Sequence, residues 1–167
     1  MISPHIFLSY PRIADERGAV SDIRAHLSRE LQIKTGQSKV VVFQDRSGLQ
    51  GGDPWSKVLE EELRLANVFV PFLCPLWLTS DWCTKEFILY LKFCKHRGAD
   101  PAIVPLLWER TDSRVAKTAR QIEIFESISK YQTVPWETLR HRDTSYLGYR
   151  EALGAFADAI AAKLLDQ

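Results

Sequence analysis

The sequence predicts an α/β domain with a central, mainly parallel sheet of five strands. Apolar runs of strand length alternate with stretches of helical periodicity, which is the pattern of successive βα units. The run at 39–44, KVVVFQ, is continuous and β-branched, as expected for a buried central strand. The 167 residues, 46% of them hydrophobic, suffice for one domain with its own core, so we expect a single domain over residues 1–167.

The expected strands are separated by segments that suit helices. Four strands are expected at 5–10, 39–44, 67–74 and 102–108, and a short edge strand at 131–136. The first helix lies within 14–36 and stops at Gly36. Its apolar contributors are expected to be Ala25, Leu27, Leu31 and Ile33.

The later helices are placed by proline, by caps and by periodicity. One helix is expected to open near Pro54–Trp55, because proline suits a first helical turn, and to run to Ala66. PLWLTS at 75–80 is expected to be the exit loop of the third strand. Ser80 then offers a cap for a helix that continues toward Gly98. Two further helices are expected at 113–130 and 147–165.

Charge and cysteine usage exclude several classes of protein. A net charge of +1, with both signs well mixed, gives no basic surface for nucleic acid. The three cysteines form no CxxC pair and are expected to be free thiols in a reducing cytosol. The longest apolar run, 68–78, is too short to span a bilayer, and no secretory leader is evident. We therefore expect a cytoplasmic protein without membrane contacts.

In open α/β sheets, ligands bind in the crevice outside the carboxyl ends of the strands. Arginine and tryptophan are each present in three of the four segments expected there, SYPRIADERG, DRSGLQGGDPW, CPLWLTSDW and WERTDS. Aromatic faces stack on flat rings, and guanidinium groups bind phosphate oxygens. The composition therefore favours a ligand that contains both.

Glu86, in SDWCTKEF at 80–87, is a carboxylate on the apolar side of a helix. The helical repeat places Glu86 among apolar residues and places Thr84 and the lysines on the opposite side of the helix. The apolar residues are Trp82, Cys83, Phe87, Leu89, Tyr90, Leu91, Phe93 and Cys94. This carboxylate could form an ion pair with Arg12, Arg46 or Arg97, or reach water at the helix edge. The interpretation of Glu86 as a functional acid is favoured over these two. Trp82 lies one turn before Glu86, near the crevice, and an aromatic wall beside a carboxylate shifts its pKa.

No other catalytic or metal-binding pattern is present. DRSGLQGGDPW lacks the closing Gly-Lys-Ser/Thr of a P-loop, and neither GxGxxG nor GxSxG occurs. The loop is equally a mobile crossover or a lid or partner surface. The four histidines have no metal-ligand spacing. We expect no metal and no bound cofactor.

Three stretches together resemble the motifs of Toll/interleukin-1 receptor (TIR) domains. They are IFLSYPR, VFQDRSGLQGGDPW and SDWCTKEF, in the family's order along residues 5–94. The sequence departs from the family pattern at His5, at Pro11, at Gln50 and at the doubled glycine Gly51–Gly52. The resemblance implies a flavodoxin-like, three-layer fold, in which strand and helix units alternate.

The resemblance also implies one of two functions. Many TIR domains cleave NAD⁺ between nicotinamide and ribose, and Glu86 matches their essential glutamate, with Trp82 at the matching aromatic position. Substrate-binding residues are then expected to be Ser9, Tyr10, Arg12, Asp45, Arg46, Trp82 and Cys83. Other members are non-catalytic scaffolds that act by homotypic contacts. A flavodoxin-like FMN carrier is disfavoured, since no Ser/Thr-rich phosphate loop is present.

The partners implied are NAD⁺ as substrate, further TIR copies, and a sensor domain or protein in the same chain or a separate one. The loop implied in assembly comprises Ser47, Gly48, Leu49, Gln50, Gly51, Gly52, Asp53 and Trp55. Because the chain begins with the first strand and ends after a helix, no sensor is expected within it. The resemblance suggests an effector of antiviral defence or immune signalling.

Overall fold

The core of the protein is one parallel sheet of five strands, described by a computed structural model for residues 2–46 and 56–167. The sheet has the order β2-β1-β3-β4-β5, and every adjacent pair is parallel. The prediction of a buried central strand at 39–44 was wrong, because β2 lies at the edge of the sheet and its residues alternate between buried and half-buried. The strands are β1 (His5–Ser9), β2 (Val41–Gln44), β3 (Val68–Leu73), β4 (Leu106–Leu107) and β5 (Val134–Pro135). This order is that of flavodoxin-like proteins, so the predicted fold is confirmed.

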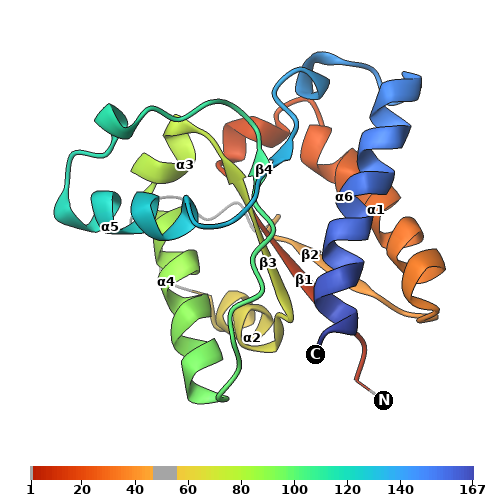
Figure 1. Ribbon diagram of the computed structural model, residues 1–167, viewed down its shortest axis with the longest axis horizontal. Helices are drawn as coiled ribbons and strands as arrows, with labels where there is room; N and C mark the ends of the chain where they lie inside the picture. Colours follow the sequence, from red (N-terminus) through yellow and green to blue (C-terminus); the bar gives the residue numbers. More distant parts are fainter. Residues whose placement is uncertain (1, 47–55) are drawn as a thin grey trace.

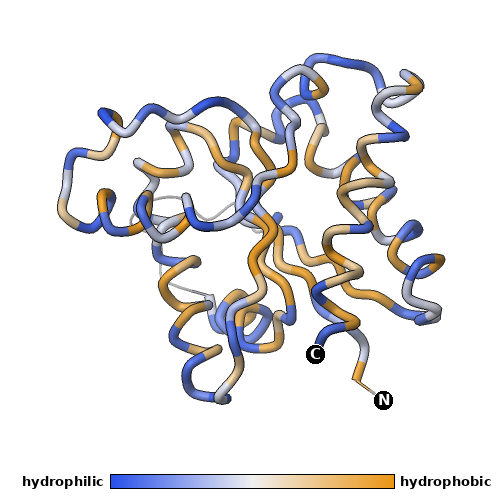
Figure 2. The backbone as a smooth tube through the Cα atoms, viewed as in Figure 1, coloured by the Kyte–Doolittle hydropathy of each residue, from blue (hydrophilic) through white to orange (hydrophobic). Residues whose placement is uncertain are grey.

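Helices cover both faces of the sheet and complete three layers (Figure 1). On one face, α1 (Ala19–Thr35) packs against α6 (Leu147–Leu165). The other face carries α2 (Lys57–Leu65), α3 (Pro75–Thr79), α4 (Asp81–His96) and α5 (Ala119–Ile128). Short 3₁₀ helices lie at Arg12–Asp15, Ser113–Val115 and Leu139–His141. Figure 2 shows hydrophobic residues concentrated along the strands, which is expected when both sheet faces are covered.

The first helix ends where the sequence predicts but buries a different set of residues. Gly36 follows it with φ 69°, and this left-handed conformation makes glycine a favourable helix terminator. The buried face consists of Val20, Ile23, Leu27 and Leu31. The predicted contributors Ala25 and Ile33 were wrong: both are exposed, Ile33 by 76%. Residues spaced by three or four from Val20 share the side of the helix that meets the rest of the fold.

Two predictions around the third strand need correction. PLWLTS is not a loop, because Pro75–Thr79 form α3, whose first residue has the proline-fixed φ that suits a first turn. The predicted strand 102–108 is reduced to Leu106–Leu107 and a single bridge between Ile103 and Phe69. Pro105 lies between them and has no N–H to donate, so a continuous ladder is not possible there.

The remaining boundaries shift by local capping. The predicted helix 113–130 is divided, because Thr118 and Gln121 form a capping box that starts α5 at Ala119. The helix expected from Pro54–Trp55 begins at Lys57, and those two residues lie outside the described part of the chain. The edge strand is confirmed but short, and α6 has its predicted bounds. None of the described helices has the length and apolar character needed to cross a membrane.

Candidate active site

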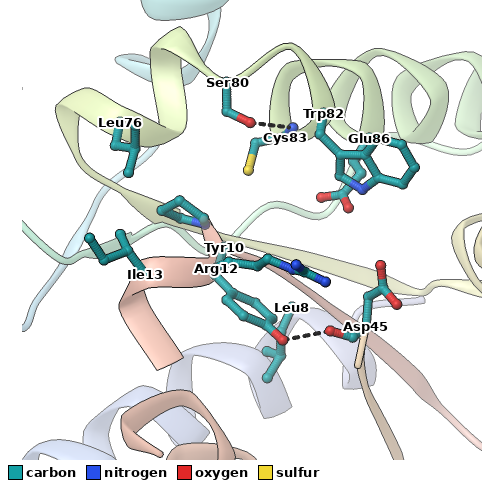
Figure 3. A pocket seen from close by; sticks show the side chains of 11 residues that line it. Leu8, Tyr10, Arg12, Ile13, Asp45, Leu76, Ser80, Trp82, Cys83 and Glu86 are labelled. Carbon is teal, nitrogen blue, oxygen red and sulfur yellow. Dashed lines mark hydrogen bonds between the residues drawn. The ribbon is translucent and has the colours of Figure 1, made fainter. Parts of the chain in front are cut away.

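A pocket of about 390 Å³ lies outside the carboxyl ends of the first three strands, at the edge where the chain leaves β1 and β3 toward opposite faces of the sheet (Figure 3). Strand order reverses at this point, and open α/β sheets bind ligands there. Residues after β1 form one wall, α3 and the start of α4 the other, and Asp45 follows β2. The lining residues are Leu8, Tyr10, Pro11, Arg12, Ile13, Asp45, Leu76, Ser80, Trp82, Cys83 and Glu86.

Glu86 reaches the pocket from the second turn of α4. Ser80 caps this helix and accepts a hydrogen bond from the backbone N–H of Cys83 at 3.2 Å, as predicted. The Glu86 side chain is only 4% exposed, and its Oε2 accepts a hydrogen bond of 2.5 Å from the hydroxyl of Ser9. Thr84 was expected on the solvent side of the helix but is buried, and its hydroxyl is satisfied there by a hydrogen bond to the backbone carbonyl of Ser80.

The structural alternatives for Glu86 do not hold within the described residues. No ion pair there joins Glu86 to an arginine or lysine. The guanidinium of Arg97 instead donates to the carbonyl oxygens of Arg64 and Ala66, at 3.0 and 2.8 Å. The low exposure also excludes a carboxylate that reaches bulk water. Glu86 is therefore a desolvated acid without a cationic partner in that part of the chain.

Burial raises the pKa of Glu86 from its ordinary value of 4.5 to about 8. The hydrogen bond from Ser9 acts in the opposite direction, because it stabilises the charged form. The negative charge of Asp45 raises the pKa further, and a hydrogen bond with Trp82 lowers it. Glu86 is thus mainly protonated at pH 7.

Tyr10 and Arg12 form the wall that follows β1. The Tyr10 hydroxyl donates to the backbone carbonyl of Asp45 at 2.7 Å and so ties the exit of β1 to that of β2. Burial raises the pKa of Tyr10 to about 12. Figure 3 shows Arg12 extending toward the end of the pocket that holds Glu86 and Asp45. A cation and two acidic groups are thus placed at one end of the pocket.

Two of the predicted substrate contacts lie elsewhere. Ser9 is fully buried behind Glu86, because residues 6–9 of β1 lie inside the sheet. Arg46 is exposed, and its guanidinium donates to Oε1 of Gln44 at 3.3 and 3.4 Å. Cys83 does line the pocket, but burial raises its thiol pKa, so it is an uncharged wall residue. The predicted assembly loop, 47–53 and Trp55, lies outside the described residues.

Trp77, which bonds Ser9, is a site residue that the sequence analysis did not identify. It lies on α3, in the segment predicted as a loop, and its indole N–H donates to Oγ of Ser9 at 3.0 Å. The available signal was Pro75, which suits the first turn of a helix and precedes three apolar residues. Ile13 and Leu76 were also missed; they line the pocket and are 58% and 47% exposed.

The described residues contain no group of three histidine, cysteine or acidic side chains arranged to hold a metal ion. The residues that line the pocket present carboxyl, guanidinium, hydroxyl and aromatic groups. These groups suit an organic ligand with a flat cationic or neutral ring and an anionic part.

A family model described as the TIR domain matches residues 6–140, most of the chain. The protein is a TIR domain. The match includes all three motifs and the pocket residues that follow β1 and β3. No curated protein sequence matches this TIR domain at a significant level.

Two solved structures are similar to this TIR domain at low sequence identity. The TIR domains of the activated Roq1 resistosome, which directly recognises the pathogen effector XopQ, share 20% identity, with 93% of this chain and 84% of that chain covered and a TM-score of 0.48. An FMN-dependent NADH-azoreductase from Bacillus anthracis, solved with FMN, shares 12% identity, with 98% and 99% covered and a TM-score of 0.46. The assignment to the family rests on the family model.

Proposed function

We propose that this TIR domain cleaves NAD⁺ between nicotinamide and ribose, giving nicotinamide and ADP-ribose or a cyclic ADP-ribose. The observation that carries the proposal is Glu86, a desolvated acid without a described cationic partner, in the pocket at the point where strand order reverses. The substrate comes from the family resemblance, because Trp82 and Glu86 match the W-x-x-x-E pattern of NAD⁺-cleaving members.

The chemistry needs a negative charge more than it needs an acid. Nicotinamide is already cationic in NAD⁺ and leaves as a neutral ring, so no proton has to be delivered to it. As the C–N bond lengthens, positive charge develops on the ribose, and a carboxylate beside it stabilises that oxocarbenium-like state. Glu86 performs this role and accepts hydrogen bonds from ribose hydroxyls, as the carboxylates of glycosidases do around their sugar cation. Water or a group within the substrate then captures the ribosyl carbon.

The other lining residues bind and orient the substrate. Trp82 offers an aromatic face beside the carboxyl group of Glu86, and Tyr10 offers one from the wall that follows β1, for the nicotinamide ring and ribose. Arg12 lines the same pocket and suits the pyrophosphate, because a guanidinium binds phosphate oxygens in a bidentate way. Ile13 and Leu76 provide an apolar surface for a base or for a second copy of the chain.

Substrate binding and ionisation of Glu86 support each other in this mechanism. The carboxyl group is mainly protonated at pH 7 before substrate binds. A cationic nicotinamide ring placed beside it lowers its pKa, since an opposite charge favours the ionised form. Binding of NAD⁺ therefore releases a proton and generates the carboxylate that the reaction needs.

The pH dependence of kcat/KM provides one test. This constant reports the ionisation of the free protein, so it should rise with pH and level off above about pH 8, where Glu86 is ionised. Below that midpoint it should fall by about tenfold per pH unit. The measurement is initial-rate nicotinamide release between pH 6 and 9.5, with circular dichroism at each pH to confirm folding. A profile that is flat across this range would contradict an essential ionised Glu86.

We also propose that copies assemble and that a sensor module, in the same chain or a separate one, triggers assembly in the cytoplasm during antiviral defence or immune signalling. The resemblance alone supports this part of the proposal.

The alternative function is a non-catalytic scaffold that acts through TIR–TIR contacts. Concentrated protein, and protein held at high density on a lipid or bead surface, should be incubated with NAD⁺ and assayed for nicotinamide. Release supports the enzyme; no release under either condition favours the scaffold.

A further inference from the structure

The hydroxyl of Ser9 lies between two buried groups that come from different helices. It accepts a hydrogen bond from the indole Nε1–H of Trp77 at 3.0 Å and donates one to Oε2 of Glu86 at 2.5 Å. Trp77 and Ser9 are both fully buried, and Glu86 is 4% exposed. The three groups thus form a continuous chain on the closed side of the site, where bulk water does not compete.

The direction of this chain follows from the donors and acceptors available. An indole N–H can only donate, and a serine hydroxyl has a single hydrogen. Trp77 engages one of the two lone pairs of Oγ, and the hydroxyl hydrogen has Glu86 as its acceptor. The indole N–H also polarises the hydroxyl, which strengthens the hydrogen bond that this hydroxyl donates to the carboxylate. Trp77 therefore favours the charged form of Glu86.

We propose that Trp77 is a positioning residue of this site: its indole N–H holds the Ser9 hydroxyl as a donor to Oε2 of Glu86, so that Glu86 ionises through its other oxygen, Oε1. The carboxylate then keeps one fixed partner behind it while Oε1 gains or loses the proton. The inference rests on the proposed function only for its catalytic consequence, since the hydrogen-bond chain belongs to the ligand-free protein.

Other groups that face Glu86 act on its ionisation independently of this chain. Asp45, from the exit of β2, raises the pKa of Glu86 by its negative charge. Arg12 lines the pocket after β1, and Tyr10 and Cys83 line it as neutral groups whose own pKa values are raised. These four side chains are unchanged in Trp77→Phe, so their effects on Glu86 are shared by that variant and the unmodified protein.

The fold holds the indole in place from two sides. Trp77 belongs to the short helix α3, which precedes α4 by one residue. Its ring packs edge-on against Phe87 at 6.1 Å between ring centroids, and Phe87 directly follows Glu86 on α4. The donor and the carboxyl group are therefore held by the same local packing.

The test is a ¹³C NMR titration of the Glu86 carboxyl group, assigned by its absence in Glu86→Gln. Trp77→Phe should raise the midpoint of Glu86 by about one pH unit, which corresponds to about 1.4 kcal/mol and is within the range of one hydrogen bond. Ser9→Ala should raise it as well. The double variant should titrate like Ser9→Ala alone, because Trp77 acts only through Ser9.

Trp136→Phe is the matched control, since Trp136 is also buried but packs against Tyr149 and Phe156 on α6. Equal Glu86 midpoints in Trp77→Phe and this control, or additive shifts in the double variant, would overturn the proposal. A second measurement needs no change at Trp77. In the unmodified protein, the indole Nε1–H resonance of Trp77 should move with the Glu86 midpoint, and in Glu86→Gln it should stay constant; an indole resonance that does not respond also overturns the proposal.

The two proposals fail in different ways. If the NMR midpoints shift as expected but no NAD⁺ is cleaved, the hydrogen-bond chain is supported and the proposed reaction is not. If the protein is active, the midpoint of the pH–rate profile should shift upward in Trp77→Phe together with the NMR midpoint. An active variant whose pH–rate profile is unchanged would show that Trp77 does not act on the reacting form of Glu86.

Discussion

Glu86→Gln is expected to abolish nicotinamide release, with a loss of at least about a hundredfold in kcat. Glutamine has the shape of glutamate, and its side-chain oxygen can accept the hydrogen bond from Ser9, so the pocket should keep its form. What it lacks is the negative charge that stabilises the ribosyl cation. The measurement is nicotinamide release by the purified variant at the highest protein density at which the unmodified protein is active.

Glu61→Gln provides the control for this substitution. Glu61 lies on α2, and its carboxylate forms an exposed ion pair with Arg64. The same chemical change there should leave nicotinamide release within about twofold of the unmodified protein, since exposed ion pairs contribute little. Undiminished turnover in Glu86→Gln would refute the catalytic role of Glu86. An inactive Glu61→Gln would instead indicate a general effect on the fold or on assembly.

Glu86→Gln should also make the protein more stable at alkaline pH. Because the pKa of Glu86 is raised to about 8 in the folded protein, the folded state keeps a proton that the unfolded chain has lost above pH 4.5. The free energy of unfolding therefore falls as pH rises from about 4.5 to 8 and stays low above it. Glutamine has no charge to desolvate, so it should escape this loss, which amounts to about 5 kcal/mol.

Thermal and denaturant unfolding at pH 5 and pH 9 would measure this effect. The two proteins should differ little at pH 5, whereas at pH 9 Glu86→Gln should melt roughly 10 °C higher. The other titrating groups are shared by both proteins, so the difference between them isolates Glu86. A variant that is equally or less stable at pH 9 would mean that the folded protein does not carry a strongly desolvated acid at this position.

Together, these two expectations describe a residue that is kept at a cost in stability. A buried carboxyl group without a cationic partner destabilises the fold in its charged form. The nearby Ser9 hydroxyl offsets part of this cost, and Asp45 adds to it. Such local conflict is typical of functional sites, where activity requires a group that the fold alone would not favour.

Local patterns in the sequence were sufficient for the fold class and for the identity of the acid. Strand segments such as KVVVFQ and the helix stop at Gly36 depend on nearby residues, so they can be recognised without knowledge of the fold. The pair Trp82 and Glu86 can be recognised in the same way, because a spacing of four places both residues on one side of a helix. The cap at Ser80 then placed this pair near the carboxyl end of β3.

Predictions failed where a residue's role depends on partners distant in sequence. Ser9 was expected to contact the ligand, yet it lies behind the acid. Its hydrogen-bond partners are Glu86, which is 77 residues later in the chain, and Trp77, which is 68 residues later. Arg46 does not line the described pocket and donates to its near neighbour Gln44, so its expected contact with phosphates stays a prediction. The spacing pattern placed Ile33 in the core, although only the packing of the helix against its neighbours decides which side is buried.

The sequence by itself determined the parallel α/β architecture, the family motifs and the carboxyl group at position 86, because these follow from periodicity and short-range spacing. The tertiary structure alone decided the surroundings of that carboxyl group: its burial, its lack of a cationic partner in the described part of the chain, and the hydrogen-bond chain from Trp77 through Ser9. Desolvation and hydrogen-bond direction arise only when α3, β1 and α4 come together, and these determine the pKa of Glu86.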